Sequence, residues 1–171
     1  MSMKIEIIDN FLPEVQWKAI DSVVSGSNIP WYFVDNLNEG SYLGNYYFSH
    51  QLVEEQKVIG PHPNQLVPIF RSVTDRLGID FSRNYRIKLN MYPRTQRRVH
   101  HSVHRDYDTG DGMATLLYFV NDNDGVTVFD GKRKIRSKAN RAALFDGSNK
   151  HHSTTPTNAN YRCTINFDYM L

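Results

Sequence analysis

Apolar and polar residues alternate with the period of a β-strand in the second half of the chain. In residues 86–92, Ile87, Leu89 and Met91 alternate with polar residues, which predicts a strand with one apolar and one polar face. Residues 161–169 show the same alternation, with the polar positions at Arg162, Thr164, Asn166 and Asp168. Shorter apolar runs predict further strands at residues 4–8, 113–121, 126–129 and 142–145.

Two segments of the first half have the spacing of a helix instead. Pro13 can open a helix that ends at Gly26. Its apolar positions are Trp17, Ile20, Val23 and Val24. A second helix follows the loop at residues 60–63 and ends at Gly78. Its apolar positions are Leu66, Ile69, Phe70, Val73 and Leu77. We expect Pro68 to lie in the first turn, because a proline deeper in the helix would break it.

Two helices followed by many short strands predict a mainly β (α+β) protein. This order favours an antiparallel double-sheet barrel with the helices packed on one side. The 171 residues of the chain contain no repeat, low-complexity tract or linker, so we expect a single domain over residues 1–171. Inside such a barrel the polar face of a strand can point into a cavity.

Composition excludes some partners and some types of metal site. The net charge of +2 is too small to imply a polyanionic partner, and no apolar run of about 18 residues is present. The first residues lack the form of a signal peptide. A single cysteine, Cys163, excludes an internal disulfide and a thiolate-rich zinc site. We therefore expect a cytoplasmic protein without a membrane partner, and any metal must depend on histidine and carboxylate ligands.

Residues 99–108 contain the most informative motif, His104-x-Asp106. If this segment is a strand, both side chains project from one face. With one distant histidine they would form a 2-His-1-carboxylate site, which leaves open positions on a metal. The distant histidine is His151 or His152, which lie 45 and 46 residues after Asp106. Arg162 follows about ten residues later.

This ordered set resembles the Fe(II)/2-oxoglutarate-dependent oxygenases, most closely small phage and bacterial members related to prolyl 4-hydroxylases. The resemblance covers roughly residues 84–169. The segments that carry it are 90–95, 103–106, 140–148 and 151–162. It implies a double-stranded β-helix (jelly-roll) core with the N-terminal helices packed on one sheet. Aligning Ser153-Thr154-Thr155 with the family pattern favours His151 as the ligand over His152.

The resemblance also implies the cofactors and the role of each residue. His104, Asp106 and His151 would hold Fe(II), and the carboxylate at Asp106 argues against the halogenating relatives. Arg162 would bind the far carboxylate of 2-oxoglutarate through its planar fork. The other expected contacts to 2-oxoglutarate are Asn90, Tyr92 and Thr164. Ascorbate is a candidate reductant, and succinate and CO2 would be released.

Three functions follow from this interpretation. The first is a dioxygenase that hydroxylates a peptide or small molecule, with a peptidyl proline as the preferred substrate. The second is a nucleobase demethylase, suggested by basic residues at positions 94–98 and 132–138, although a solvated hairpin explains these better and nucleic acid is not the expected partner. The third is a cupin-like module that binds a metal without turnover. The sequence predicts neither the substrate nor the oligomeric state.

Overall fold

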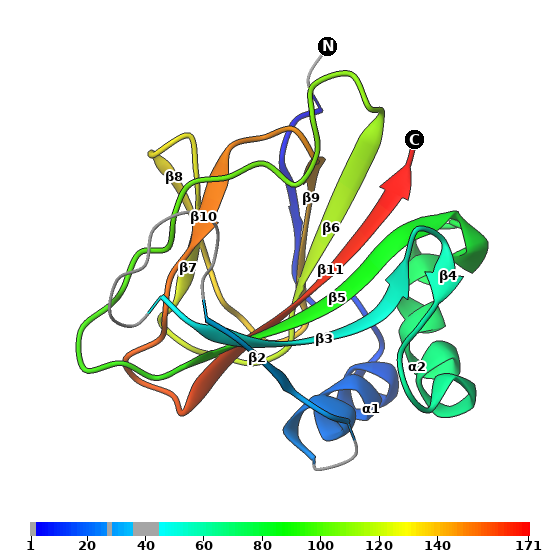
Figure 1. Ribbon diagram of the computed structural model, residues 1–171, viewed down its shortest axis with the longest axis horizontal. Helices are drawn as coiled ribbons and strands as arrows, with labels where there is room; N and C mark the ends of the chain where they lie inside the picture. The colour runs from blue at the N-terminus through cyan, green and yellow to red at the C-terminus, as the bar shows by residue number, and fades with distance from the viewer. Residues whose placement is uncertain (1–2, 27–28, 36–44) are drawn as a thin grey trace.

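The computed structural model of the protein describes residues 3–26, 29–35 and 45–171 (Figure 1). The strands are β1 (Glu6–Ile8), β2 (Tyr32–Val34), β3 (Tyr47–Glu54), β4 (Lys57–Val58), β5 (Asn84–Pro93), β6 (Met113–Phe119), β7 (Val126–Phe129), β8 (Arg133–Arg136), β9 (Arg141–Asp146), β10 (His151–Ser153) and β11 (Tyr161–Met170). The helices are α1 (Glu14–Ser25) and α2 (Pro63–Arg76), and a short 3-10 helix spans Phe81–Arg83. All strands and helices expected from the periodicity are present.

The strands form two antiparallel sheets, which confirms the predicted mainly β architecture. The larger sheet has the order β1-β9-β6-β11-β5-β3-β2, with β4 paired to β3, and the smaller has the order β10-β7-β8. Both helices lie against the larger sheet, and the smaller sheet lies on its other side (Figure 1). None of the described helices is long and apolar enough to cross a membrane.

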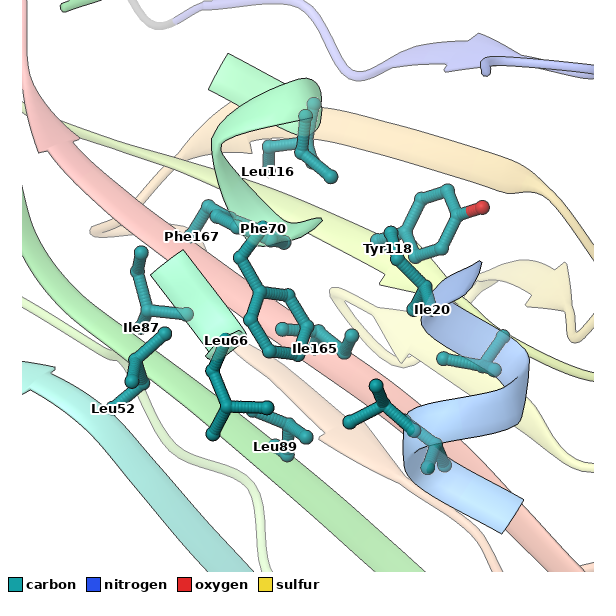
Figure 2. Packing of buried hydrophobic residues seen from close by; sticks show 14 of the residues in the cluster. Ile20, Leu52, Leu66, Phe70, Ile87, Leu89, Leu116, Tyr118, Ile165 and Phe167 are labelled. Atoms are coloured by element: carbon teal, nitrogen blue, oxygen red, sulfur yellow. The ribbon is translucent and has the colours of Figure 1, made fainter. Parts of the chain in front are cut away.

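The apolar faces of β5 and β11 form the main core with the helices. Figure 2 shows Phe70 of α2 and Ile20 of α1 among the sheet residues Leu89 and Ile165, and all four side chains are fully buried. Burying a side chain of this size stabilises the folded state by about 1.5–3 kcal/mol. Because alternate residues point to opposite faces, this packing turns the polar set of each strand towards the smaller sheet.

Two local expectations were wrong. Pro68 lies inside α2 rather than in its first turn, because the helix already begins at Pro63. Pro68 is exposed, so water can reach the carbonyl that its missing N–H leaves unbonded. The segment around His104-x-Asp106 is also not a continuous strand: His104 forms an isolated bridge with His151, and Asp106 lies in a bend.

Candidate metal centre and its cavity

The backbones of His104 and His151 form a reciprocal hydrogen-bonded pair. Each N–H donates to the other residue's carbonyl at 2.9 Å, and the ring centroids lie 4.5 Å apart. Each ring also places Nδ1 near a backbone carbonyl, that of Ser102 at 3.2 Å and that of Asn149 at 2.9 Å. A carbonyl only accepts, so Nδ1 carries the proton and Nε2 keeps its lone pair for a metal.

Asp106 reaches the same point from a turn beside β9. Its N–H donates to the carbonyl of Gly147 at 3.1 Å. This close approach requires glycine at position 147, because a Cβ there would lie 2.8 Å from the ring of Tyr107. One potential ligand atom each from His104, Asp106 and His151 lies within 4.8 Å of the others. The Oδ2 atom of Asp106 is buried 3.6 Å from His151 Nε2, and it has no hydrogen-bond partner among the described residues. The three residues therefore fit a divalent cation, which would satisfy this oxygen.

The charges of His104 and Asp106 suit metal binding at neutral pH. Burial, together with the neighbouring His151, lowers the pKa of His104. Burial opposes ionisation of Asp106, but His151 and Arg86 hold the pKa of its carboxyl below the usual value. A neutral imidazole and an ionised carboxylate are the forms that coordinate a metal.

A buried ion-pair network, which the sequence did not reveal, holds Asp106 in place. Arg86 of β5 donates from Nη2 to Asp106 Oδ1 at 2.8 Å and from Nε to Asp168 Oδ2 at 2.6 Å. Asp168 of β11 is fully buried, and it also accepts from Thr115 at 2.7 Å. Burial raises the pKa of Asp168 to about 6, which leaves it ionised at neutral pH. The sequence contained one indication of this network, because Arg86 and Asp168 are both polar positions in strands with alternating residues. The register of β5 with β11 pairs the two residues.

We expect Arg86→Met to weaken metal binding by about 10- to 100-fold, because outer partners of ligands typically contribute this much. The affinity is measured by calorimetry with Mn(II), after circular dichroism has confirmed the fold. Arg83→Met is the matched control, since Arg83 is exposed and donates only to the carbonyl of Met170. A folded Arg86→Met protein with wild-type Mn(II) affinity would contradict this role.

Arg162 lies in the same cavity, fully buried on β11. Its donors reach only neutral oxygens: Nε to Ser137 Oγ and Nη2 to Thr127 Oγ1, each at 2.7 Å, and Nη1 to the Thr154 carbonyl at 3.4 Å. No carboxylate among the described residues forms an ion pair with it. Burial lowers the pKa of Arg162 to about 10, so the guanidinium remains charged. An unneutralised buried cation fits an anionic ligand such as the far carboxylate of 2-oxoglutarate.

The other residues predicted from the sequence also line this cavity, which has a volume of about 240 Å³. They are Asn90, Tyr92 and Thr164. His152 does not join the metal group; its Nε2 lies 3.1 Å from Nδ1 of His100 near the surface. Further residues, which were not among the predicted site residues, also line the cavity. They are Tyr47, Lys88, Arg105, Leu117, Thr127, Ser153 and Asn166, together with Arg86.

His101, which the sequence left without a role, supports Tyr92 from outside the cavity. The two rings stack with centroids 5.0 Å apart, and His101 Nδ1 lies 2.8 Å from Ser153 Oγ. Only 4% of the residue is exposed. Burial and the nearby Arg162 lower the pKa of His101 from 6.5 to about 4.

This pKa predicts a loss of stability in acid. The unfolded chain takes up the proton below pH 6.5 and the folded protein only near pH 4, so the free energy of unfolding falls between these values. The shift corresponds to about 3 kcal/mol. His101→Phe keeps a stacked ring without the titration, and we expect its urea unfolding, measured without metal, to depend less on pH by this amount. Parallel pH profiles for both proteins would refute the assignment.

No known protein family profile matches the sequence, and no curated protein matches it. The fold, in contrast, is similar to several solved structures. A 2OG-Fe(II) oxygenase family oxidoreductase from Burkholderia pseudomallei has a TM-score of 0.68 and 12% identity over 96% of this chain and 84% of its own. For a prolyl-4-hydroxylase from Pseudomonas putida the TM-score is 0.58, with 12% identity over 97% and 91% of the two chains.

A third similar structure is a non-heme α-ketoglutarate-dependent epimerase, SnoN, from nogalamycin biosynthesis. Its TM-score is 0.64, with 12% identity over 97% of this chain and 77% of its own. The chain therefore has the fold of the 2-oxoglutarate/Fe(II) oxygenases, as the sequence resemblance implied. At this identity the likeness concerns the fold, and the reaction must be argued from the residues of this chain.

Proposed function

We propose that this chain is an Fe(II)- and 2-oxoglutarate-dependent dioxygenase that hydroxylates its substrate, with release of succinate and CO2. The observation that carries the proposal is Arg162, a buried guanidinium that pairs with no carboxylate of the described residues and lies in the same cavity as the three potential ligands. A metal alone would not need this cation, whereas a dicarboxylate bound to the metal would. The presence of Arg162 also weighs against a cupin-like module that holds a metal without turnover.

In this proposal each side chain of the site has a separate task. His104, Asp106 and His151 would hold the iron, and Arg162 would orient 2-oxoglutarate from the far end of the cavity. The additional contacts to 2-oxoglutarate would come from Asn90, Tyr92 and Thr164. When bound, iron and 2-oxoglutarate supply the oxygen chemistry, with ascorbate as a candidate reductant, and the protein supplies orientation and exclusion of water.

A peptidyl proline remains the first substrate class to examine, given the resemblance to prolyl 4-hydroxylases. Nucleobase demethylation has less support, since several basic side chains in or next to residues 94–98 and 132–138 form ion pairs within the chain. Lys138 and Arg141 both pair with Asp9, and Arg98 pairs with Asp124. We also propose, from the single cysteine alone, a cytosolic location, and we treat residues 1–171 as one domain.

The test is succinate release that depends on both Fe(II) and 2-oxoglutarate, measured with a panel of prolyl peptides and without substrate. Binding of 2-oxoglutarate to the Mn(II)-loaded protein is measured in parallel by calorimetry. The proposal requires both signals in the wild-type protein and the loss of succinate release in His104→Ala. Intact turnover in His104→Ala, or the absence of any 2-oxoglutarate binding, would refute it.

A further inference from the structure

The cavity has more cationic side chains than the binding of 2-oxoglutarate would require. Four cationic side chains line it, whereas Asp106 is the one carboxylate among its described lining residues. The four are Arg86, Lys88, Arg105 and Arg162. Arg86 is paired with Asp106 and with Asp168, which does not line the cavity. The proposed 2-oxoglutarate would neutralise Arg162, and Arg105 is exposed to solvent. Lys88 remains as a partly buried charge without an assigned anion.

Among the described residues, the hydrogen-bond partner of Lys88 is an uncharged group. Its Nζ donates to the hydroxyl of Tyr47 at 2.9 Å and lies 5.3 Å from the centroid of that ring. The residues paired with it across the sheet are Gln51 on β3 and Asn166 on β11, both neutral amides. None of the ion pairs within the described parts of the chain includes Lys88. An ammonium group has three N–H donors, and Tyr47 accepts one of them.

Burial gives this arrangement an electrostatic cost in the absence of a ligand. It lowers the pKa of Lys88, and the charge of Arg86 lowers it further, whereas the more weakly acting carboxylates of Asp106, Asp168 and Glu54 raise it. It also raises the pKa of Tyr47, so that the phenol stays neutral and cannot act as a counter-ion. A partly buried cation whose polar partner is neutral is stabilised when an anion enters beside it.

Lys88 and Arg162 start from separate positions along the sheet. With about 3.4 Å per residue along β5, its backbone lies about 7 Å from Arg86 and about 14 Å from Tyr92. Arg162 lies beside Tyr92, 5.3 Å from the ring centroid. Tyr47, which holds Lys88, stacks on the ring of Tyr92 with centroids 5.7 Å apart. The two cations therefore contact different members of a stacked ring pair.

We propose that Lys88 receives a carboxylate of the substrate, and that the substrate is a small carboxylic acid such as a free amino acid. This inference rests on the proposed function, because it concerns the same cavity. The volume of the cavity agrees with a small substrate. It is about 240 Å³, below the roughly 300–1,000 Å³ typical of ligand pockets, which leaves little space beside 2-oxoglutarate. A proline substrate would accordingly be free or C-terminal, with its own carboxylate, rather than internal in a peptide.

The test compares acids with their own primary amides. Free L-amino acids and short dicarboxylic acids, each with its amide, are assayed for stimulation of succinate release, together with an acetylated and amidated prolyl peptide. We expect at least one acid to stimulate release, with a KM at least about tenfold below that of its amide, as for a hydrogen bond to a charged group. No stimulation by any acid, or equal stimulation by acid and amide or by the blocked peptide, would overturn the inference.

Variants of Lys88 then assign the preference to this side chain. Lys88→Met should remove the preference for acid over amide, and Lys88→Arg should retain it, whereas structural damage would impair both substrates equally. If Lys88→Met instead weakens 2-oxoglutarate binding and keeps the acid preference, Lys88 belongs to the cosubstrate and the inference is wrong. The wild-type calorimetry with Mn(II) and 2-oxoglutarate separates a failure here from a failure of the proposed function.

Discussion

Replacing His151 by alanine is expected to abolish succinate release and to lower metal affinity by more than about 100-fold. Outer partners of a metal ligand already contribute about 10- to 100-fold, so the loss of one of three proposed ligands should exceed this range. His151 is buried with its Nδ1 beside the carbonyl of Asn149, and alanine would leave no donor atom at that position. The measurements are Mn(II) calorimetry and succinate release.

His152→Ala is the matched control for this prediction. The two histidines are adjacent on β10, so their side chains point to opposite faces of the strand. His152 faces His100, with ring centroids 5.4 Å apart, and lies outside the group of ligands. We expect His152→Ala to bind Mn(II) as the wild-type protein does. The reverse result, with turnover lost in His152→Ala and kept in His151→Ala, would show that the other histidine is the ligand.

Replacing Arg162 by methionine is expected to raise the Kd of 2-oxoglutarate by about 100-fold or more. A buried guanidinium can donate two hydrogen bonds to a carboxylate, and each bond to a charged group contributes about 1.5–3 kcal/mol. The same change should leave the protein without ligand as stable as the wild type or more stable, because it removes a desolvated cation that lacks a charged partner. Calorimetry with Mn(II) and 2-oxoglutarate gives the Kd, and thermal unfolding gives the stability.

The opposite signs of these two effects make the prediction specific to a ligand-binding role. A purely structural Arg162 would lower stability on replacement and leave the Kd of the folded fraction unchanged. Arg162→Lys provides the control for geometry, since it keeps a charge but loses the planar fork. We expect its Kd to lie between those of the wild type and Arg162→Met. Wild-type affinity in Arg162→Met would refute the assignment to 2-oxoglutarate.

The sequence alone predicted the helices and strands, and it predicted several of the side chains that line the cavity. Alternation in β5 and β11 is a local pattern, because each strand must bury one face against the helices whatever its partner is. The same alternation placed Asn90, Tyr92, Arg162 and Thr164 on polar faces, and all four line the cavity. His104 and Asp106 do lie together with His151, although the segment that contains them is not the strand that the sequence suggested.

Only the tertiary structure decided which distant side chains meet. The pairing of Arg86 with Asp168 and Asp106 depends on the register of β5 against β11 and on the path of the 99–108 segment, and neither leaves a periodic signal in the chain. Lys88 and Tyr47 lie 41 residues apart, and they meet only through the pairing of β3 with β5. Pro68 was misplaced for a related reason, since helix boundaries follow from packing and solvent access as well as from local preference. Contacts across strands are fixed by the shared burial of both sheets, which no segment of the chain specifies by itself.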